Sequence, residues 1–496
     1  MRSTIVTGLV LLATGCAAIR GLDDYSIAGA SVGTGDDAAM HATSAEGGAG
    51  CTTHAGCDAT AVCVKATGRC VPLTTLECPR VLGDARADDA VLVGTLLGAE
   101  SERAALLAAG ELASGPASLP HLVVIGCDVG ADALAPARHL AEELHVAAIL
   151  GPQRAEDVVA VSQIGARAGA LLVTDSPVGS ITNLADDDLT WRIVSSDTQR
   201  AKLVIEQMNE LETLLRATRS LTTVKLAIAH ASDALGTSAR DAITGKLILN
   251  GHFLLDAANA GYVRDDQVAA GDAAGYAALV TAYARQFRPD MVFVTAAEQI
   301  TSLVVPLEQS LAAARVVDKP YYVLTDAART DELLARIASG DLPVDIRRRV
   351  RGVGPVAPTA SASVLADFTA AFVARHGTAP SSTANAMYDA TYALAYASGT
   401  GSDRIGHGLR ALAVGQQAFV GPKGMSDVAG LLAKGQPLQL VGTQGPLQWD
   451  ASGDLRGGTL EVWCIGSRNG AAAYGSSGMT MDVQTQVVGG AYVQCQ

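Results

Sequence analysis

From about Ala90 onward, short apolar runs alternate with segments in which apolar residues recur every three or four positions. Runs such as "AVLVGTLL", "HLVVIGC" and "VAAILG" are apolar throughout, which is typical of strands buried on both faces. The segments between them, such as "RAALLAAGELA" and "AEDVVAVSQIGARAG", have the spacing of amphipathic helices. Strands that are each followed by a helix predict a parallel sheet with helices on both faces.

The same pattern starts again after Leu221, following the long helical segment "TQRAKLVIEQMNELETLLRAT". Strand-like runs "VKLAIAH", "PDMVFVTA" and "PYYVLTD" alternate with helical segments, among them "GTSARDAITGKLILNG". Two such units of similar length predict an α/β fold with two doubly wound, parallel-sheet lobes around a central cleft. A ligand is expected in that cleft, at the carboxyl ends of the strands.

The first 50 residues do not follow this pattern. Residues 1–16, "MRSTIVTGLVLLATGC", resemble a bacterial lipoprotein signal peptide that is cleaved before Cys16, whose sulfur then carries lipid. A plain secretory signal is the alternative. Residues 17–50 are rich in Gly, Ser and Asp and predict a flexible tether. We therefore expect an exported protein that is lipid-anchored to the cell envelope, in the periplasm or at the outer membrane.

Residues 51–78 are expected to form a cysteine-rich module, since four cysteines fall within twenty residues: Cys51, Cys57, Cys63 and Cys70. A zinc knot usually contains a Cys-x-x-Cys pair, which is absent here, and export favours disulfides. The favoured pairing is Cys51–Cys63 with Cys57–Cys70, although three connectivities are open. The four remaining cysteines suggest two further bridges, Cys78–Cys127 and Cys464–Cys495.

Composition excludes several classes of function. The chain has 496 residues, of which 49% are hydrophobic and 17% charged, and its formal net charge is −14, which argues against binding to nucleic acid. No apolar run reaches the length of a membrane span. The sequence has no Gly-x-Ser-x-Gly elbow, His-Glu-x-x-His pair or phosphate-binding loop. We expect no enzymatic activity, no metal site and no cofactor.

Five segments in order resemble the type I periplasmic binding proteins, specifically the leucine/isoleucine/valine-binding branch of ABC-transporter receptors. The segments are "AAILGPQRAEDVVAVSQIGARAGALLVTDSP", "TWRIVSSDTQRAKLVIEQM", "VKLAIAHASDALGTSARDAI", "MYDATYALAYA" and "GPLQWDASGDLRGGTLEVWCI", and the resemblance covers roughly residues 88 to 468. It implies that residues 79–198 and 358–437 form lobe 1 and that residues 199–357 and 438–496 form lobe 2. The lobes would close by bending at crossovers near Asp197, Pro358 and Leu438.

The resemblance also implies a ligand site in lobe 1. Family members that bind amino acids hold the ligand carboxylate with a hydroxyl and backbone amides at the start of the helix after the Gly-Pro loop. Gln153, Arg154 and Ala155 occupy that stretch here, with Ala155 at the hydroxyl position. Glu156 and Asp157 follow and would repel a carboxylate unless Arg154 turns inward. The alternative is a self-capped helix without a ligand contact.

A second expected contact in lobe 1 is the turn after "LLVTD", where Ser176, Gly179 and Ser180 offer hydroxyls and amides. An ordinary Ser-Pro turn is the alternative there.

In lobe 2 the family commonly places aromatic residues where this chain has Leu235 and Ala297. The acid that holds a ligand ammonium falls near Asp326, which could equally cap a helix. Asp233 and Glu298 are weaker candidates on the same rim.

The resemblance implies an extracytoplasmic solute-binding protein that captures an amino acid or related small solute for ABC-type import. The expected partners are the small-molecule ligand and a membrane permease, and we expect a monomer. Because the expected pocket departs from the amino-acid binders, the alternative is a sensor or surface-interaction module with a remodelled or degenerate pocket.

Overall fold

The computed structural model describes residues 50–130, 132–402 and 404–496. The expected signal peptide, Cys16 and nearly all of the expected tether lie outside the described residues. Among the described residues, no helix is long and apolar enough to cross a membrane.

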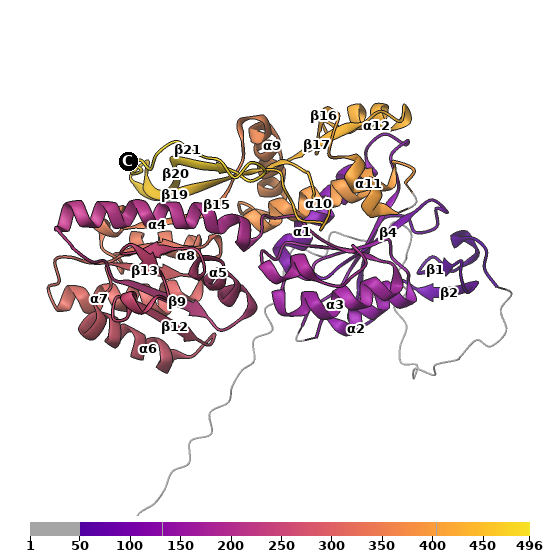
Figure 1. Cartoon of the computed structure of the whole chain (residues 1–496). Coiled ribbons are helices and arrows are strands. Elements are labelled where there is room, and N and C mark those ends of the chain that lie inside the picture. Colours follow the sequence, from indigo (N-terminus) through magenta and orange to yellow (C-terminus); the bar gives the residue numbers. More distant parts are fainter. Residues whose placement is uncertain (1–49, 131, 403) are drawn as a thin grey trace, which may run out of the picture. The chain divides into compact units, whose positions relative to one another are not determined.

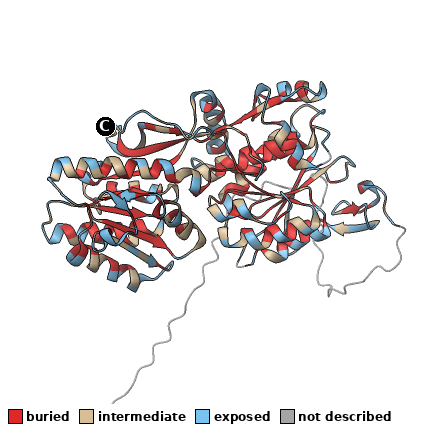
Figure 2. Ribbon diagram, viewed as in Figure 1, coloured by how far each residue is buried: buried red, intermediate tan, exposed pale blue. Residues whose placement is uncertain are grey.

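Lobe 1 is built on a six-stranded sheet in the order β3-β5-β4-β6-β7-β8, in which only β3 is antiparallel to its neighbour. Its strands are β3 (Arg80–Leu82), β4 (Val91–Thr95), β5 (Leu122–Gly126), β6 (Ala148–Leu150), β7 (Leu171–Thr174) and β8 (Thr190–Arg192). The helices between them are α1 (Ala99–Ala113), α2 (Leu134–Arg138), which continues as a π-helical turn over His139–Glu143, and α3 (Ala155–Ala168). The strands are almost entirely buried, as their continuous apolar runs predict (Figure 2).

Lobe 2 is built on an eight-stranded sheet in the order β12-β9-β13-β14-β15-β19-β20-β21. The first five strands in this order are parallel and the last three extend the sheet antiparallel. Its strands are β9 (Leu226–Ala231), β12 (Val263–Val268), β13 (Met291–Val294), β14 (Tyr321–Leu324), β15 (Val350–Val356), β19 (Thr459–Arg468), β20 (Ala471–Asp482) and β21 (Val488–Gly489).

Helices cover both faces of the lobe 2 sheet (Figure 1). One face packs against α4 (Asp197–Arg219) and α5 (Ala234–Thr244). The other packs against α6 (Ala273–Thr281), α7 (Val305–Ala313) and α8 (Asp331–Ala338). Successive strand residues alternate between the faces, so that Leu226 and Ile228 belong to one core and Ala227 and Ala229 to the other. The predicted doubly wound architecture is therefore confirmed.

A further group of elements follows β15. It comprises α9 (Ala362–His376), α10 (Ser382–Ser398), α11 (Ile405–Ala411), α12 (Met425–Ala433) and a small sheet of β16 (Gln416–Phe419), β17 (Leu438–Gly442) and β18 (Gly445–Pro446). In this small sheet β17 pairs with β16 on one side and with β18 on the other.

Three local expectations differ from the structure. The helix expected over 236–251 ends at Thr244, because Asn250 and Gly251 both adopt positive φ and join β10 (Ile248–Leu249) to β11 (His252–Phe253). The segment "GPLQWDASGDLRGGTLEVWCI" resembles the family's closing hairpin, with turn formers around Asp450. In the structure these turn formers close only one bridge, between Trp449 and Leu455, and β19 forms its long hairpin with β20. Strand β12 was not expected, since its sequence "VRDDQV" is largely polar at a sheet edge.

The cysteine-rich module contains β1 (Ala61–Val64), β2 (Arg69–Pro72) and two disulfides, Cys51–Cys63 and Cys57–Cys70. Disulfides also join Cys78 to Cys127 and Cys464 to Cys495. Val62 and Leu73 of the module are buried in the lobe 1 core. The module therefore packs against lobe 1 as part of its folded surface.

Asp389 of α10 anchors the turn between β17 and β18. The Thr443 amide donates to both carboxylate oxygens, at 2.9 and 2.8 Å, and the Thr443 hydroxyl donates at 2.8 Å. A Cβ atom on Gly442 would lie 2.4 Å from Asp389 Oδ2, so the turn requires glycine at that position. The carboxyl group is buried, and this burial raises its pKa to about 7 despite the hydrogen bonds.

The raised pKa of Asp389 predicts a pH-dependent stability. The unfolded chain has an Asp pKa of about 4, so the contribution of Asp389 to the free energy of unfolding is greatest below about pH 4 and falls as the pH rises to about 7. At about 1.4 kcal/mol per pKa unit, wild type should lose a few kcal/mol more than Asp389→Asn between about pH 4 and about pH 8. Urea unfolding at several pH values measures this difference, with the exposed Asp427→Asn as the control. Parallel pH profiles for wild type and Asp389→Asn would contradict it.

Candidate functional site

The Gly-Pro loop lies between β6 and α3, at the carboxyl edge of the lobe 1 sheet. Gln153 Oε1 accepts a hydrogen bond from the Gly98 amide at 3.0 Å. Its Nε2 lies 3.4 Å from Ser101 Oγ and 3.5 Å from Asp175 Oδ2. Gln153, which was expected to contact the ligand, therefore joins three loops of lobe 1 to one another.

Helix α3 begins without a side-chain cap. Ala155, its first residue, is partly buried, and Arg154 is exposed and pairs with Asp157 across 3.5 Å. Glu156 reaches lobe 2, where its Oε1 accepts a hydrogen bond from the Ala234 amide at 3.2 Å. The first backbone amide of α5 therefore donates to a carboxylate of lobe 1. Free backbone amides at the start of a helix are groups that bind anions.

A second contact joins the lobes at the turn after β7. The Gly179 amide donates to Ser238 Oγ of α5 at 2.9 Å, while Ser180 is exposed. Leu235, also on α5, packs against the hydrophobic core of lobe 1. The Gly179 amide, a predicted ligand contact, is therefore hydrogen-bonded to lobe 2.

Asp326 follows β14 and makes a third contact of this kind. Its Oδ2 accepts a hydrogen bond from Ser382 Oγ at the start of α10, at 3.0 Å. Of the weaker candidates, Asp233 caps α5 by accepting from the Gly236 amide at 2.6 Å. Glu298 accepts from the Tyr276 hydroxyl at 2.7 Å, and Ala297 is exposed.

Three buried polar side chains, two directly after β7 and one at the start of α4, have polar atoms without hydrogen-bond partners. Asp175 Oδ1, Ser176 Oγ and Asp197 Oδ2 have no hydrogen-bond partner, and the three residues are 5%, 2% and 7% exposed. Burial raises the pKa of the Asp175 carboxyl to about 7. It also raises the pKa of the Asp197 carboxyl above its ordinary value, against the charge of Arg200, a hydrogen bond from Ser238 and the charge of Arg192.

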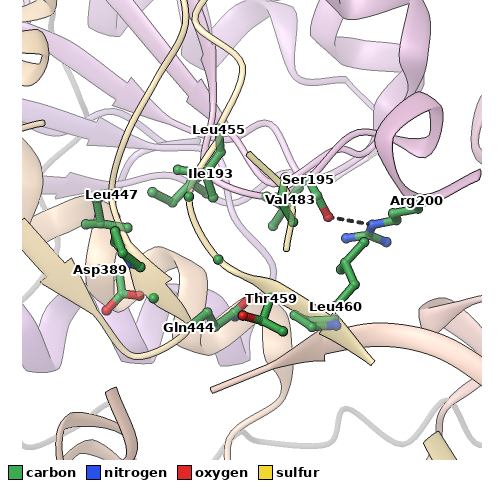
Figure 3. Close-up of a pocket in the computed structure, with 16 residues that line it drawn as sticks. Ile193, Ser195, Arg200, Asp389, Gln444, Leu447, Leu455, Thr459, Leu460 and Val483 are labelled. Carbon is green, nitrogen blue, oxygen red and sulfur yellow. Dashed lines mark hydrogen bonds between the residues drawn. The ribbon is translucent and has the colours of Figure 1, made fainter. Parts of the chain in front are cut away.

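Two small cavities lie near the crossovers, and the second is lined by Asp197. The first is at the crossovers, where Arg200 Nε donates to Ser195 Oγ at 3.0 Å and Asp389 lies across the cavity (Figure 3). The second is in lobe 2 and is lined by Asp197, Arg200 and Asp326 together with mainly apolar side chains of α4, α5 and the sheet. Each has a volume of about 20 Å³, enough for one water molecule.

The structure thus places Glu156 and Gly179 against α5 and Asp326 against α10. Sequence reasoning missed the partners Ser238 and Ser382, and it missed the buried carboxyls of Asp175 and Asp197, each of which has one oxygen without a hydrogen-bond partner. Asp175 had a signal in the sequence, since a carboxylate directly after a buried parallel strand lies at the ligand edge of a sheet.

The contact between Gly179 and Ser238 predicts a measurable stabilisation of the closed lobes. Ser238→Ala leaves the Gly179 amide without its partner and should cost about 1 kcal/mol in the free energy of unfolding. The closed arrangement should also become less populated, which small-angle scattering reads as a larger radius of gyration. Ser232→Ala, an exposed serine just before α5, is the matched control. If Ser238→Ala and Ser232→Ala have the same free energy of unfolding and the same radius of gyration, the Gly179–Ser238 contact does not stabilise the closed lobes.

No family model matches the chain, and no curated protein matches it in sequence. Solved structures do match its fold. An ABC transporter substrate-binding protein of Desulfitobacterium hafniense in complex with leucine is 18% identical, with a TM-score of 0.51 over 78% of this chain and 99% of that chain. The branched-chain amino acid transporter substrate-binding protein LivJ of Streptococcus pneumoniae, in complex with isoleucine, is 17% identical, with a TM-score of 0.52 and coverage of 78% and 99%.

A solute-binding protein of an ABC transporter from Rhodopseudomonas palustris, in complex with 3,4-dihydroxybenzoic acid, is 15% identical. Its TM-score is 0.55, over 80% of this chain and 98% of that chain. The fold of the chain is therefore that of the type I periplasmic binding proteins, as the sequence resemblance predicted.

Proposed function

We propose that this chain is an extracytoplasmic solute-binding lipoprotein that captures a small ligand between its two lobes and presents it to the permease of an ABC importer. One observation carries the proposal: polar groups of lobe 1 and lobe 2 meet at the carboxyl edges of the sheets, where Glu156 accepts from the Ala234 amide of α5 and Ser238 accepts from the Gly179 amide. In this fold that is where solutes bind. The matched structures, which are complexes with leucine, isoleucine and 3,4-dihydroxybenzoic acid, support the same role.

Lipid attachment at Cys16 would keep the receptor at the membrane, near its permease. The cysteine-rich module lies between the expected tether and lobe 1, and its packing against the lobe 1 core makes it a rigid base for that lobe. We propose no catalytic role and no cofactor for the chain.

The second candidate is a sensor or surface-interaction module with a remodelled pocket. The direct contacts between the lobes favour it, because they occupy groups that hold a carboxylate ligand in the amino-acid binders. A receptor whose lobes bind each other would respond to a solute only when the solute replaces those contacts.

A thermal-shift screen of the full chain, purified in detergent, tests the proposal. The panel contains amino acids, amines, short amides, and aliphatic and aromatic acids. A ligand at about 100 times its dissociation constant should add about 2.7 kcal/mol to the free energy of unfolding, which is a visible shift of the melting temperature. Asp326→Ala should reduce the shift of any ligand that carries an ammonium group. A panel in which no solute moves the melting temperature would remove the support for transport and leave the second candidate.

A further inference from the structure

The lobe 2 sheet has a second edge, opposite to the one at which the lobes meet. Strands β12, β9, β13, β14 and β15 run parallel in that order, so their amino ends lie side by side along this edge. The connections that lead into these strands form what we call the amino edge of lobe 2: residues 220–225, 245–262, 288–290, 314–320 and 339–349. The predicted ligand contacts all lie outside these connections.

Hydrogen bonds hold neighbouring connections of the amino edge together. They run from the Val224 amide to Asn250 Oδ1 at 2.8 Å, from the Lys225 amide to Asp290 Oδ2 at 2.9 Å, and from Arg349 Nη1 to the Pro320 carbonyl at 2.9 Å. The side chain of Arg219, at the end of α4, adds a bond from its Nη2 to the Lys319 carbonyl at 2.6 Å. The amino edge is therefore one continuous surface whose parts are fixed relative to one another.

Large apolar side chains are exposed on this surface. Of the eleven that are exposed among the described residues, five lie here: Ile248, Phe253, Leu255, Val317 and Val344. Val317 is 91% exposed and Phe253 is 61% exposed. Ile248 and Phe253 are paired across the β10–β11 hairpin and share its outer face, while Leu249 and Leu254 belong to the core. The hairpin therefore cannot turn its apolar outer face inward. Such a concentration of exposed apolar groups is typical of an interaction site.

The same connections carry basic side chains. Five of them form no ion pair with any other residue that the structure describes: Lys246, Arg288, Arg315, Arg347 and Arg348. Four of the five acids in these connections are paired with arginines, and only Asp256 is not. At the adjoining end of β19, Arg468 and the C-terminal carboxylate of Gln496 add one charge of each sign. The amino edge is thus positive, although the whole chain has a net charge of −14.

Helices α4, α5, α7 and α8 also end at this edge. The C-terminal carbonyls of a helix carry a partial charge of about −0.5, which favours basic side chains nearby and offsets part of their charge. It does not account for the apolar side chains beside them. A second copy of the chain would present the same cations and be repelled. Anionic phospholipids fit both components, because apolar side chains enter the headgroup layer while Lys and Arg side chains meet the lipid phosphates.

We propose that the amino edge of lobe 2 is a membrane-contact surface that binds a bilayer containing anionic phospholipids. Ile248, Phe253, Leu255 and Val317 enter the headgroup layer, and the five unpaired cations meet the phosphates. The negative charge of the rest of the chain confines the contact to this edge. Together with the lipid proposed at Cys16, the surface would hold the chain to the membrane at two places. The proposal does not depend on which solute the lobes bind.

Acetylation of lysines by a water-soluble reagent tests this contact, because Lys246 lies in the surface and Lys434, also exposed, follows α12. The full chain is bound to vesicles of equimolar phosphatidylcholine and phosphatidylglycerol, and mass spectrometry measures the modification of each lysine. Lys246 should react at least about fivefold more slowly there than on vesicles of phosphatidylcholine alone. Lys434 should react at the same rate on both. High salt should remove the difference at Lys246, because it screens the attraction.

Variants of exposed side chains test the two components separately. Phe253→Ser removes an apolar contact, and Arg315→Gln combined with Arg348→Gln removes two cations. Each change should raise the rate of Lys246 modification on the mixed vesicles at least about threefold. Val414→Ser alters an exposed valine between α11 and β16 and is the matched control. It should leave Lys246 protected.

Equal rates of Lys246 modification on the two kinds of vesicle would overturn the proposal. Protection that persists unchanged in both variants would also overturn it, since the contact would then not involve these side chains. Protection of Lys246 that appears without vesicles and grows with protein concentration would show that the surface binds a second copy instead. All of these outcomes leave solute binding untouched, and the thermal-shift panel tests that function independently.

Discussion

The hydrogen bond from the Gly179 amide to the Ser238 hydroxyl joins the lobes at the point where a fold of this kind holds its solute. It is supported by the contact between Glu156 and the start of α5, and by the packing of Leu235 on the lobe 1 core. These contacts have one consequence for chemistry. They occupy the Gly179 and Ala234 amides, which are therefore not free for a ligand while the lobes are in contact. Buried groups of both kinds remain without hydrogen-bond partners, namely Asp175 Oδ1 and Asp197 Oδ2 among the acceptors and Arg192 Nε and Nη1 among the donors.

The folded chain tolerates this arrangement because both carboxyls have raised pKa values. Asp175 has a pKa of about 7, so near neutral pH a large fraction of it carries a proton when nothing positive is bound. Asp197 has Arg200 and Arg192 nearby and accepts a hydrogen bond from Ser238, and these interactions offset part of the cost of burial.

Most of the fold could be predicted from the sequence, because continuous apolar runs and helical spacing are local signals. Helix α4 shows this well, since its apolar spacing agrees with a complete capping box between Ser196 and Gln199. The apolar spacing predicts a helix as far as Gly251, whereas α5 ends at Thr244. Asn250 and Gly251 form a two-residue turn that can be recognised in the sequence. The family resemblance predicts Asp326 and the loop of Gln153 as ligand contacts, but the hydrogen-bond partners of these residues could not be predicted. Ser382 lies 56 residues after Asp326 and Ser238 lies 59 residues after Gly179, and pairs so distant in the sequence are set by how the lobes meet.

The most direct measurement of the central claim is the hydrogen exchange of the Gly179 and Ala234 backbone amides in the ligand-free protein. If the lobes bind each other as described, both amides exchange slowly, and Ser238→Ala speeds the exchange of Gly179 while Ser232→Ala does not. Exchange of both amides at the rate of exposed loops in the wild-type protein would show that the donors of the cleft are free for a ligand, and would contradict the claim.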